Sequence, residues 1–275
     1  MGTLPEGFFP RIVFLLQNYG TSFLLGAGTT LYIALISTII GCLIGFVCGI
    51  IQTIPVGHND NFFKKALLWL SRVILNIYVE VFRGTPMMAQ AVFIFYGYSY
   101  LTGNTLPRMF AAILIVSINT GAYMAETVRG GILSIDLGQT EGAKAIGMTH
   151  VQTMTGVILP QALRNIMPQI GNNLIINIKD TCVLSAISIV ELFFTFKSVS
   201  GAYYTMFEAI TITMAIYLAM TLSFSRLLRW LEGKMDGDDS FDLATADTLA
   251  HTSGMVRFRS GNKEVDKTGV KERGR

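Results

Sequence analysis

Polar side chains gather within one otherwise apolar part of this chain, at Asn173, Asn177, Lys179 and Asp180. Asn173, Asn177 and Asp180 are spaced i, i+4 and i+7, so a helix places them on one face. Ionisable groups at membrane depth are costly and usually face protein or water. One interpretation is a zwitterion site, with the carboxylate near Lys179 and the ammonium group near Asp180 and the amides. The other is a Lys179–Asp180 pair that closes an interface between two subunits.

The chain has the composition of a membrane protein. Of its 275 residues, 51% are hydrophobic and only 14% are charged, and the mean hydropathy is +0.51. Soluble domains carry roughly 25% charged residues. A membrane-spanning helix needs about 20 apolar residues, so the apolar stretches predict an all-α membrane protein with about five spans. These spans are expected near residues 22–52, 67–101, 110–132, 166–196 and 204–230.

The second of these apolar stretches is interrupted by Arg83-Gly84-Thr85-Pro86. Pro86 removes a backbone donor, and Gly84 loosens the turn before it. A broken membrane helix of this kind often lines a solute path. Thr85 and Gln90 are therefore candidate pathway residues, and an ordinary kink is the alternative interpretation.

Small residues in the first span predict a close helix contact. Gly41, Gly45 and Gly49 recur every four residues. Such a ridge lets two membrane helices approach each other closely. Ordinary glycine use in a membrane helix is the alternative.

A long polar segment, 136–168, separates two of the apolar stretches. Asp136 and Gln139 have the spacing of a capping box, which predicts that a helix begins here. Gly147 then predicts a terminator or bend, and Thr149 can cap a second short helix. A polar unit of helix, glycine and helix on one side of a membrane suggests a docking surface for a soluble partner.

The distribution of basic residues predicts the orientation, because cytoplasmic loops carry an excess of lysine and arginine. Basic residues concentrate between the first two spans, around the polar segment and after the last span. We therefore expect an extracytoplasmic segment at 1–19, a membrane domain at 20–232 and a cytoplasmic tail at 233–275. The tail is polar and nearly lacks aromatic residues, so it is expected to be disordered.

No residue pattern indicates catalysis, a metal site or nucleic-acid binding. His58, His150 and His251 are scattered in polar segments, and the three cysteines lie in apolar ones. No sequence of the form GxxxxGK[ST], which would cradle a nucleotide phosphate, is present. The chain is therefore expected to bind no cofactor of its own and to have no enzymatic activity.

The polar segment resembles the EAA loop of ABC-importer permeases, E-A-A-x-x-x-G-x(9)-I-x-L-P, with about 134–165 as the whole loop. This resemblance implies a coupling helix that sits in a groove of a separate ATPase subunit, which would bind ATP and Mg²⁺. Closing of the ATPase dimer would then move the loop as a lever. Glycine replaces the first alanine of the motif. The residues that the resemblance assigns to coupling are Glu141, Gly142, Ala143, Gly147, Ile158 and Pro160.

Further segments between about 29 and 230 resemble the polar amino-acid permeases of ABC importers. Residues 83–90 look like R-G-T-P-L-L-V-Q, and 122–132 like A-Y-x-A-E-x-x-R-G-G-I. Residues 159–164 match L-P-Q-A-L-R, and 171–181 resemble G-N-E-F-x(4)-K-D-[TS]. Asn173 stands where the family often has an acidic residue, which argues against a dedicated arginine or lysine transporter.

The resemblance implies a type I ABC-importer permease fold, in the inner membrane of a prokaryote, with the N-terminus outside and the C-terminus in the cytoplasm. The implied partners are two ATPase subunits, a second permease subunit, an extracytoplasmic binding protein, an amino-acid substrate and membrane lipid, but no nucleic acid. The main alternative is an ion-coupled secondary amino-acid transporter that uses Lys179 and Asp180 as an ion-coupling pair. An intramembrane enzyme and an ABC-associated sensor are further alternatives.

Overall fold

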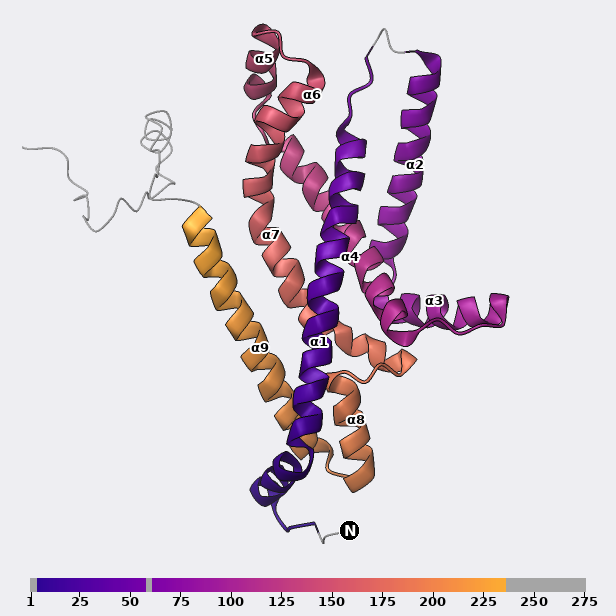
Figure 1. The fold of residues 1–275 in the computed structure, drawn as a ribbon, viewed down its shortest axis with the longest axis vertical. Coiled ribbons are helices and arrows are strands. Elements are labelled where there is room, and N and C mark those ends of the chain that lie inside the picture. The colour runs from indigo at the N-terminus through magenta and orange to yellow at the C-terminus, as the bar shows by residue number, and fades with distance from the viewer. Residues whose placement is uncertain (1–3, 58–60, 236–275) are drawn as a thin grey trace, which may run out of the picture. The chain divides into compact units, whose positions relative to one another are not determined.

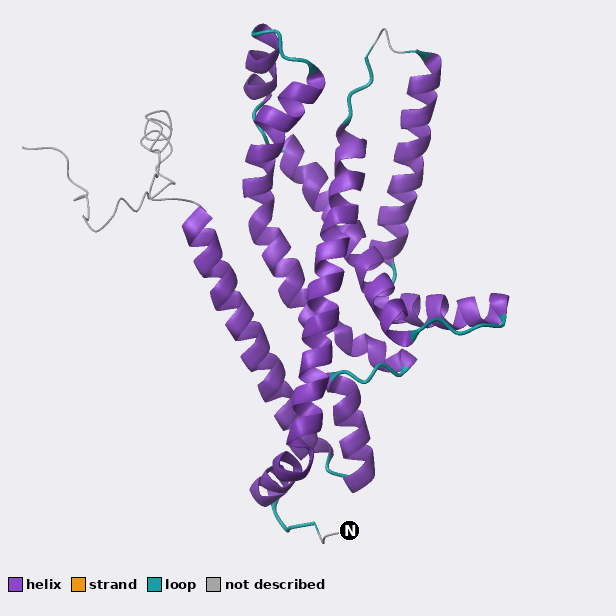
Figure 2. Ribbon diagram, in the orientation of Figure 1, coloured by secondary structure: helices purple, strands orange, loops and turns teal. Residues whose placement is uncertain are grey.

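The computed structural model describes residues 4–57 and 61–235, and all regular structure in these ranges is helical (Figures 1 and 2). From residue 236 on, the expected tail lies outside the described residues. The helices are α1 (Phe8–Thr53), α2 (Phe62–Gly84), α3 (Met87–Thr102), α4 (Arg108–Leu133), α5 (Leu137–Ala145), α6 (His150–Thr153), α7 (Leu159–Asp180), α8 (Leu192–Tyr203) and α9 (Met206–Met235). A π-helical turn, Met154–Ile158, joins α6 to α7, and a 3₁₀ segment, Thr181–Ile187, follows α7.

Three of these helices, α1, α4 and α9, are long and apolar enough to cross a membrane. The run from α6 to the 3₁₀ segment, followed by α8 at a bend of 53°, adds up to one more span. The predicted second span is not among them. Its residues form α2, which carries Lys64, Lys65, Arg72 and Glu80, and α3, which has only 16 residues. By length and composition, the described residues therefore contain three such helices, or four with the bent pair, against about five spans expected from the sequence.

The break predicted in the second apolar stretch is present. Thr85 and Pro86 lie between α2 and α3, and the two helices run in clearly different directions (Figure 1). The boundary expected near residue 20, in contrast, falls inside α1, a helix of 46 residues.

The glycine ridge predicted in the first span packs directly on α4. A Cβ atom added at Gly41 would lie 2.6 Å from the Cβ of Thr120, and one at Gly49 would lie 2.7 Å from the Cβ of Val128. Real side chains do not tolerate such distances, so only glycine allows this approach. The prediction of a close helix contact is confirmed, and the contact between α1 and α4 is the most extensive between helices of the described chain.

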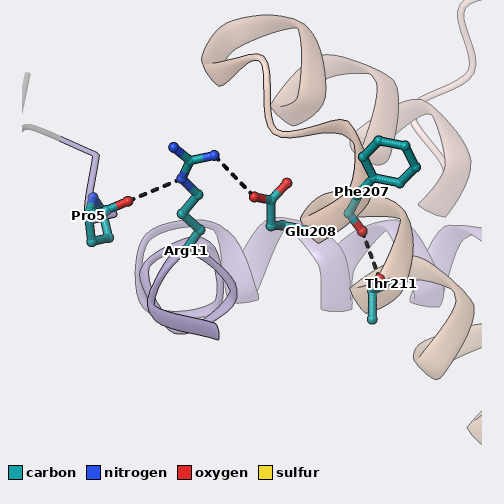
Figure 3. A network of polar contacts seen from close by, with 5 residues as sticks. All are labelled: Pro5, Arg11, Phe207, Glu208 and Thr211. Atoms are coloured by element: carbon teal, nitrogen blue, oxygen red, sulfur yellow. Dashed lines mark hydrogen bonds and ion pairs between the residues drawn. The ribbon is translucent and has the colours of Figure 1, made fainter. Parts of the chain in front are cut away.

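The start of α1 is fastened to the start of α9. The guanidinium of Arg11 donates from Nη1 to Oε1 of Glu208 at 3.3 Å and from Nε to the carbonyl of Pro5 at 3.1 Å (Figure 3). One turn further along α9, the hydroxyl of Thr211 donates to the carbonyl of Phe207 at 2.7 Å. The beginning of α1 and the last helix therefore meet at one end of the bundle.

The link between α7 and α8 is fixed by a buried carboxylate. Glu191 is fully buried and accepts hydrogen bonds from the backbone N–H groups of Phe193, at 2.7 Å, and Phe194, at 2.6 Å. These N–H groups have no partner within α8, so Glu191 caps that helix. The hydroxyl of Tyr217 on α9 also donates to Glu191 at 3.2 Å. One side chain thus ties α8 to α9.

Candidate functional site

The broken helix between α2 and α3 is held by the side chain of Gln90. Its Nε2 donates to the carbonyl of Phe82 at 2.9 Å, to the carbonyl of Thr85 at 3.0 Å and to the hydroxyl of Thr85 at 2.8 Å. Gln90 is only 7% exposed. A helix break leaves carbonyls without helical partners, and buried ones must be satisfied. Gln90, a predicted pathway residue, therefore supports the break, and together with Thr85 it lines a cavity of about 430 Å³ between α2 and α3.

A cavity of about 460 Å³ lies beside this break, between the α2–α3 link, α4 and α7. Clefts of roughly 300–1,000 Å³ hold small-molecule ligands. The described lining has one cationic and one anionic side chain, Arg83 and Asp180, and is otherwise neutral. Its polar residues are Arg83, Thr85, Asn119, Thr120, Tyr123, Asn173, Asn177 and Asp180.

The predicted polar face of α7 lines this cavity. Asn173, Asn177 and Asp180 all contribute to its wall, as their spacing on one helix face predicts. Lys179 does not: it lines a different cavity of about 550 Å³, together with apolar side chains of α8 and α9. Adjacent residues on a helix project about 100° apart, so Lys179 and Asp180 point to different sides.

The two asparagines on this face are nearly buried and already hydrogen-bonded. Asn177 donates from Nδ2 to the hydroxyls of Thr38, at 2.8 Å, and Thr120, at 2.9 Å. Asn173 donates to the carbonyl of Gln169 at 3.0 Å. These amides join α7 to α1 and α4 and give the cavity a fixed wall.

Arg83 is the cationic side chain of the cavity. Its guanidinium forms an ion pair with Glu126 on α4 and lies 5.4 Å from the centre of the Tyr123 ring, a cation–π distance. Arg83 and Glu126 also line a second cavity, of about 300 Å³. Sequence reasoning did not assign Arg83 to the pathway, although its place in the R-G-T-P segment was a signal. Tyr123 lies in the 122–132 segment, and nothing in the sequence of that segment indicated that Tyr123 would line a cavity.

The polar segment forms the helix, turn and helix that its sequence predicts. Gly147 adopts a left-handed φ of +82°, and the N–H of Met148 donates to the carbonyl of Ala143 at 3.1 Å. This is the arrangement by which glycine ends a helix. Thr149 and Gln152 form a reciprocal capping box at the start of α6.

At the start of α5 the predicted capping box is only half right. The carboxylate of Asp136 accepts a hydrogen bond from the N–H of Gly138 at 2.6 Å, so Asp136 does cap the helix. The side chain of Gln139 does not return to Asp136. Instead its Oε1 accepts a hydrogen bond from Gln161 Nε2 at 3.4 Å, which fastens α5 to α7.

The residues predicted to couple to an ATPase divide into two groups. Glu141, Gly142, Gly147 and Pro160 are exposed, whereas Ala143 and Ile158 are each 5% exposed. Ile158 belongs to the apolar cluster between α4 and α7. The first group is therefore accessible to a partner, and the second anchors the loop to the bundle.

Sequence reasoning missed the apolar side chains that this loop exposes. Leu137 and Ile146 are each 78% exposed, and Val151 is 68% exposed. Large apolar side chains exposed together on an otherwise polar surface mark an interaction site.

The described residues contain no group of three or more histidine, cysteine, aspartate or glutamate side chains able to hold a metal ion.

Comparison with known proteins places these features in one family. Residues 65–237 match the family described as binding-protein-dependent transport system inner membrane component. An arginine transport system permease protein from Bacillus subtilis is 30% identical over 230 residues, covering 84% of this chain and 96% of that protein. A glutamine transport system permease protein from Escherichia coli is 33% identical over 211 residues, covering 76% and 91%.

Two solved structures are also similar. A crystal structure of an amino acid ABC transporter with histidines has 32% sequence identity and a TM-score of 0.70, and the match covers 83% of this chain and 98% of that one. An inward-facing methionine ABC transporter has 21% identity and a TM-score of 0.60, covering 77% and 97%, and shares the fold.

Proposed function

The chain belongs to the family of binding-protein-dependent transport system inner membrane components, and we propose that it is a permease subunit of an ATP-driven importer for polar amino acids. The names of the similar arginine and glutamine permeases support this substrate class. The observation that carries the proposal is the cavity of about 460 Å³ beside the broken helix, which offers a cation and an anion, Arg83 and Asp180. A solute that bears both charges fits such a lining.

The loop from α5 to the start of α7 is the proposed contact with two separate ATPase subunits. Its helix caps give it a defined shape, and Leu137, Ile146 and Val151 give it an exposed apolar surface. Ile158 packs against α4, so a displacement of the loop reaches the helix that lines the cavity. ATP and Mg²⁺ bind to the ATPase subunits, because this chain has no phosphate-binding sequence.

The remaining partners follow from the family. A second permease subunit, identical or related, completes the pathway, and an extracytoplasmic binding protein delivers the amino acid. The chain lies in the inner membrane with the α5–α6 loop and the C-terminus in the cytoplasm and the N-terminus outside, in agreement with the distribution of basic residues.

Ion-coupled secondary transport is not favoured, since the relatives are subunits of ATP-driven systems. That alternative relied on Lys179 and Asp180 as an ion-coupling pair. The two side chains line different cavities.

The test is uptake into proteoliposomes that contain this chain with its ATPase and binding protein. ATP sealed inside should drive accumulation of a labelled polar amino acid, and a protonophore should have little effect. The control is an ATPase subunit with its phosphate-binding lysine replaced by alanine. Uptake that survives this control and collapses with the protonophore would overturn the proposal.

A further inference from the structure

Arg83 lies at the boundary between two cavities. It lines the larger one together with Asp180, and it lines the smaller one together with Glu126. Arg83 lies in the last turn of α2, and Tyr123 and Glu126 are one turn apart on α4. The ion pair and the cation–π contact therefore join the broken helix to α4 at this boundary.

The larger cavity has few donors that are free to bind a carboxylate. The amides of Asn173 and Asn177 donate to protein groups, as described above. The amide of Asn119 donates to Gln90 Oε1 at 3.0 Å, and the hydroxyl of Thr85 donates to the carbonyl of Val81 at 2.7 Å. A carboxylate only accepts hydrogen bonds, so it must find donors.

Arg83 meets that need better than any other side chain of the described lining. Its planar guanidinium presents paired N–H donors whose geometry matches a carboxylate. In the structure the carboxylate of Glu126 is the ionic partner of this guanidinium. Their side chains are 39% and 43% exposed, and a pair so open to solvent is weak enough to be exchanged.

We infer that Arg83 receives the carboxylate of the transported amino acid by exchanging Glu126 for it, so that the Arg83–Glu126 pair is a barrier between the two cavities. This inference rests on the proposed function. The carboxylates of the amino acid and of Glu126 compete for the guanidinium of Arg83 and repel each other, so the binding of one displaces the other. The barrier then opens only when the carboxylate of a solute has reached Arg83.

The smaller cavity already contains partners for the displaced Glu126. Arg72 and Arg129 line it, and Arg129 lies one turn beyond Glu126 on α4. The other acidic residue of this cavity is Glu80. Glu126 therefore moves from one cation to another, which lowers the cost of the exchange.

The two partners of the pair should respond in opposite ways to the loss of their charge. Arg83→Gln removes the carboxylate receptor, so we expect amino-acid uptake by the reconstituted complex to fall by about tenfold or more. Glu126→Gln removes the competitor and the barrier. We expect it to retain uptake, to lower the half-saturating amino-acid concentration, and to raise ATP hydrolysis in the absence of amino acid.

A merely structural ion pair predicts a different outcome. Both single variants would then lose uptake alike, and the charge exchange Arg83→Glu with Glu126→Arg would restore it. We expect no restoration, because a glutamate at position 83 repels the carboxylate. Equal losses together with restoration would overturn the inference. Arg83→Lys keeps the positive charge but lacks the paired N–H donors, so it should give intermediate uptake. It replaces Arg83→Gln as the test variant if the complex that contains Arg83→Gln does not assemble.

The ligand group itself is tested on the permease–ATPase complex without its binding protein. We would compare thermal stabilisation by the transported amino acid with that by the amine that lacks its carboxylate. Only the amino acid should stabilise the unmodified complex, and Arg83→Gln should abolish the difference. Equal stabilisation by both compounds would overturn the inference. If the proposed function itself is wrong, the result differs from this one, because the unmodified complex then shows no ATP-driven uptake of any amino acid.

Discussion

Gln90 and Asn119 share a hydrogen bond of 3.0 Å across two helices, and both also donate to the carbonyl of Phe82. Gln90 lies on α3 and Asn119 on α4, while Phe82 lies in the last turn of α2. Three helices therefore meet at one carbonyl that the helix break has left without its usual partner. This contact keeps the break open beside the cavity.

We expect Gln90→Leu to destabilise the protein by about 1–3 kcal/mol, because the carbonyl of Thr85 loses the hydrogen bond from Gln90 and the amide of Asn119 loses its acceptor on Gln90. The measurement is the thermal unfolding midpoint of the detergent-solubilised complex. Met88→Leu, at an exposed position of α3, is the control and should have little effect. An unchanged midpoint in Gln90→Leu would show that the break does not depend on this side chain.

The glycine ridge gives a second prediction. Gly45→Ala should destabilise the α1–α4 contact by about 1–3 kcal/mol, because the added methyl group meets the Cβ of Met124 and neighbouring backbone. Gly28→Ala in the same helix is the matched control, since nothing lies within 4 Å of its added Cβ. Unfolding midpoints in detergent should separate the two variants, and equal midpoints would contradict tight packing.

Gly147 gives a third prediction, about coupling. Its φ of +82° disfavours other residues, so Gly147→Leu should strain the turn by about 1–2 kcal/mol and misplace the exposed loop. Membrane insertion should be preserved while amino-acid-stimulated ATP hydrolysis, or assembly with the ATPase, is lost. Gly142→Ala, which restores the family's alanine in open space, is the control and should remain coupled. Unchanged uptake by Gly147→Leu would exclude a coupling role for this turn.

Glu191 gives a fourth prediction. Glu191→Ala removes the acceptor for two backbone N–H groups at the start of α8, and a lost helix cap costs about 0.5–2 kcal/mol. Tyr217→Phe removes only the single side-chain hydrogen bond to Glu191 and should cost less. Limited proteolysis near α8 should therefore be faster in Glu191→Ala than in Tyr217→Phe. The reverse order would place the main role of Glu191 in its bond to Tyr217.

Local chemistry made several parts of the fold predictable. Gly147 and Thr149 mark helix ends by backbone conformation and side-chain reach, which depend on a few neighbouring residues. The break at Pro86 and the shared face of Asn173 and Asn177 are likewise local. The structure agrees with each of these predictions.

The misses have a common physical origin in contacts between distant parts of the chain. Nothing in the residues around Arg83 reveals that Glu126, more than 40 positions away, is its partner. The hydrogen bond between Gln90 and Asn119 likewise depends on where α4 lies, which the residues around Gln90 do not reveal. The broken segment 67–101 is a separate case, since it gives two helices whose directions hydropathy does not determine.

The contact between Gly45 and α4 also bears on how force passes through the subunit. With their backbones this close, α1 and α4 are expected to move as one unit, and Ile158 packs the α5–α6 loop against α4. We therefore expect a displacement of this loop to move α1 and α4 together, and to be accommodated at Thr85 and Pro86, which lie between α2 and α3 and outside both helices.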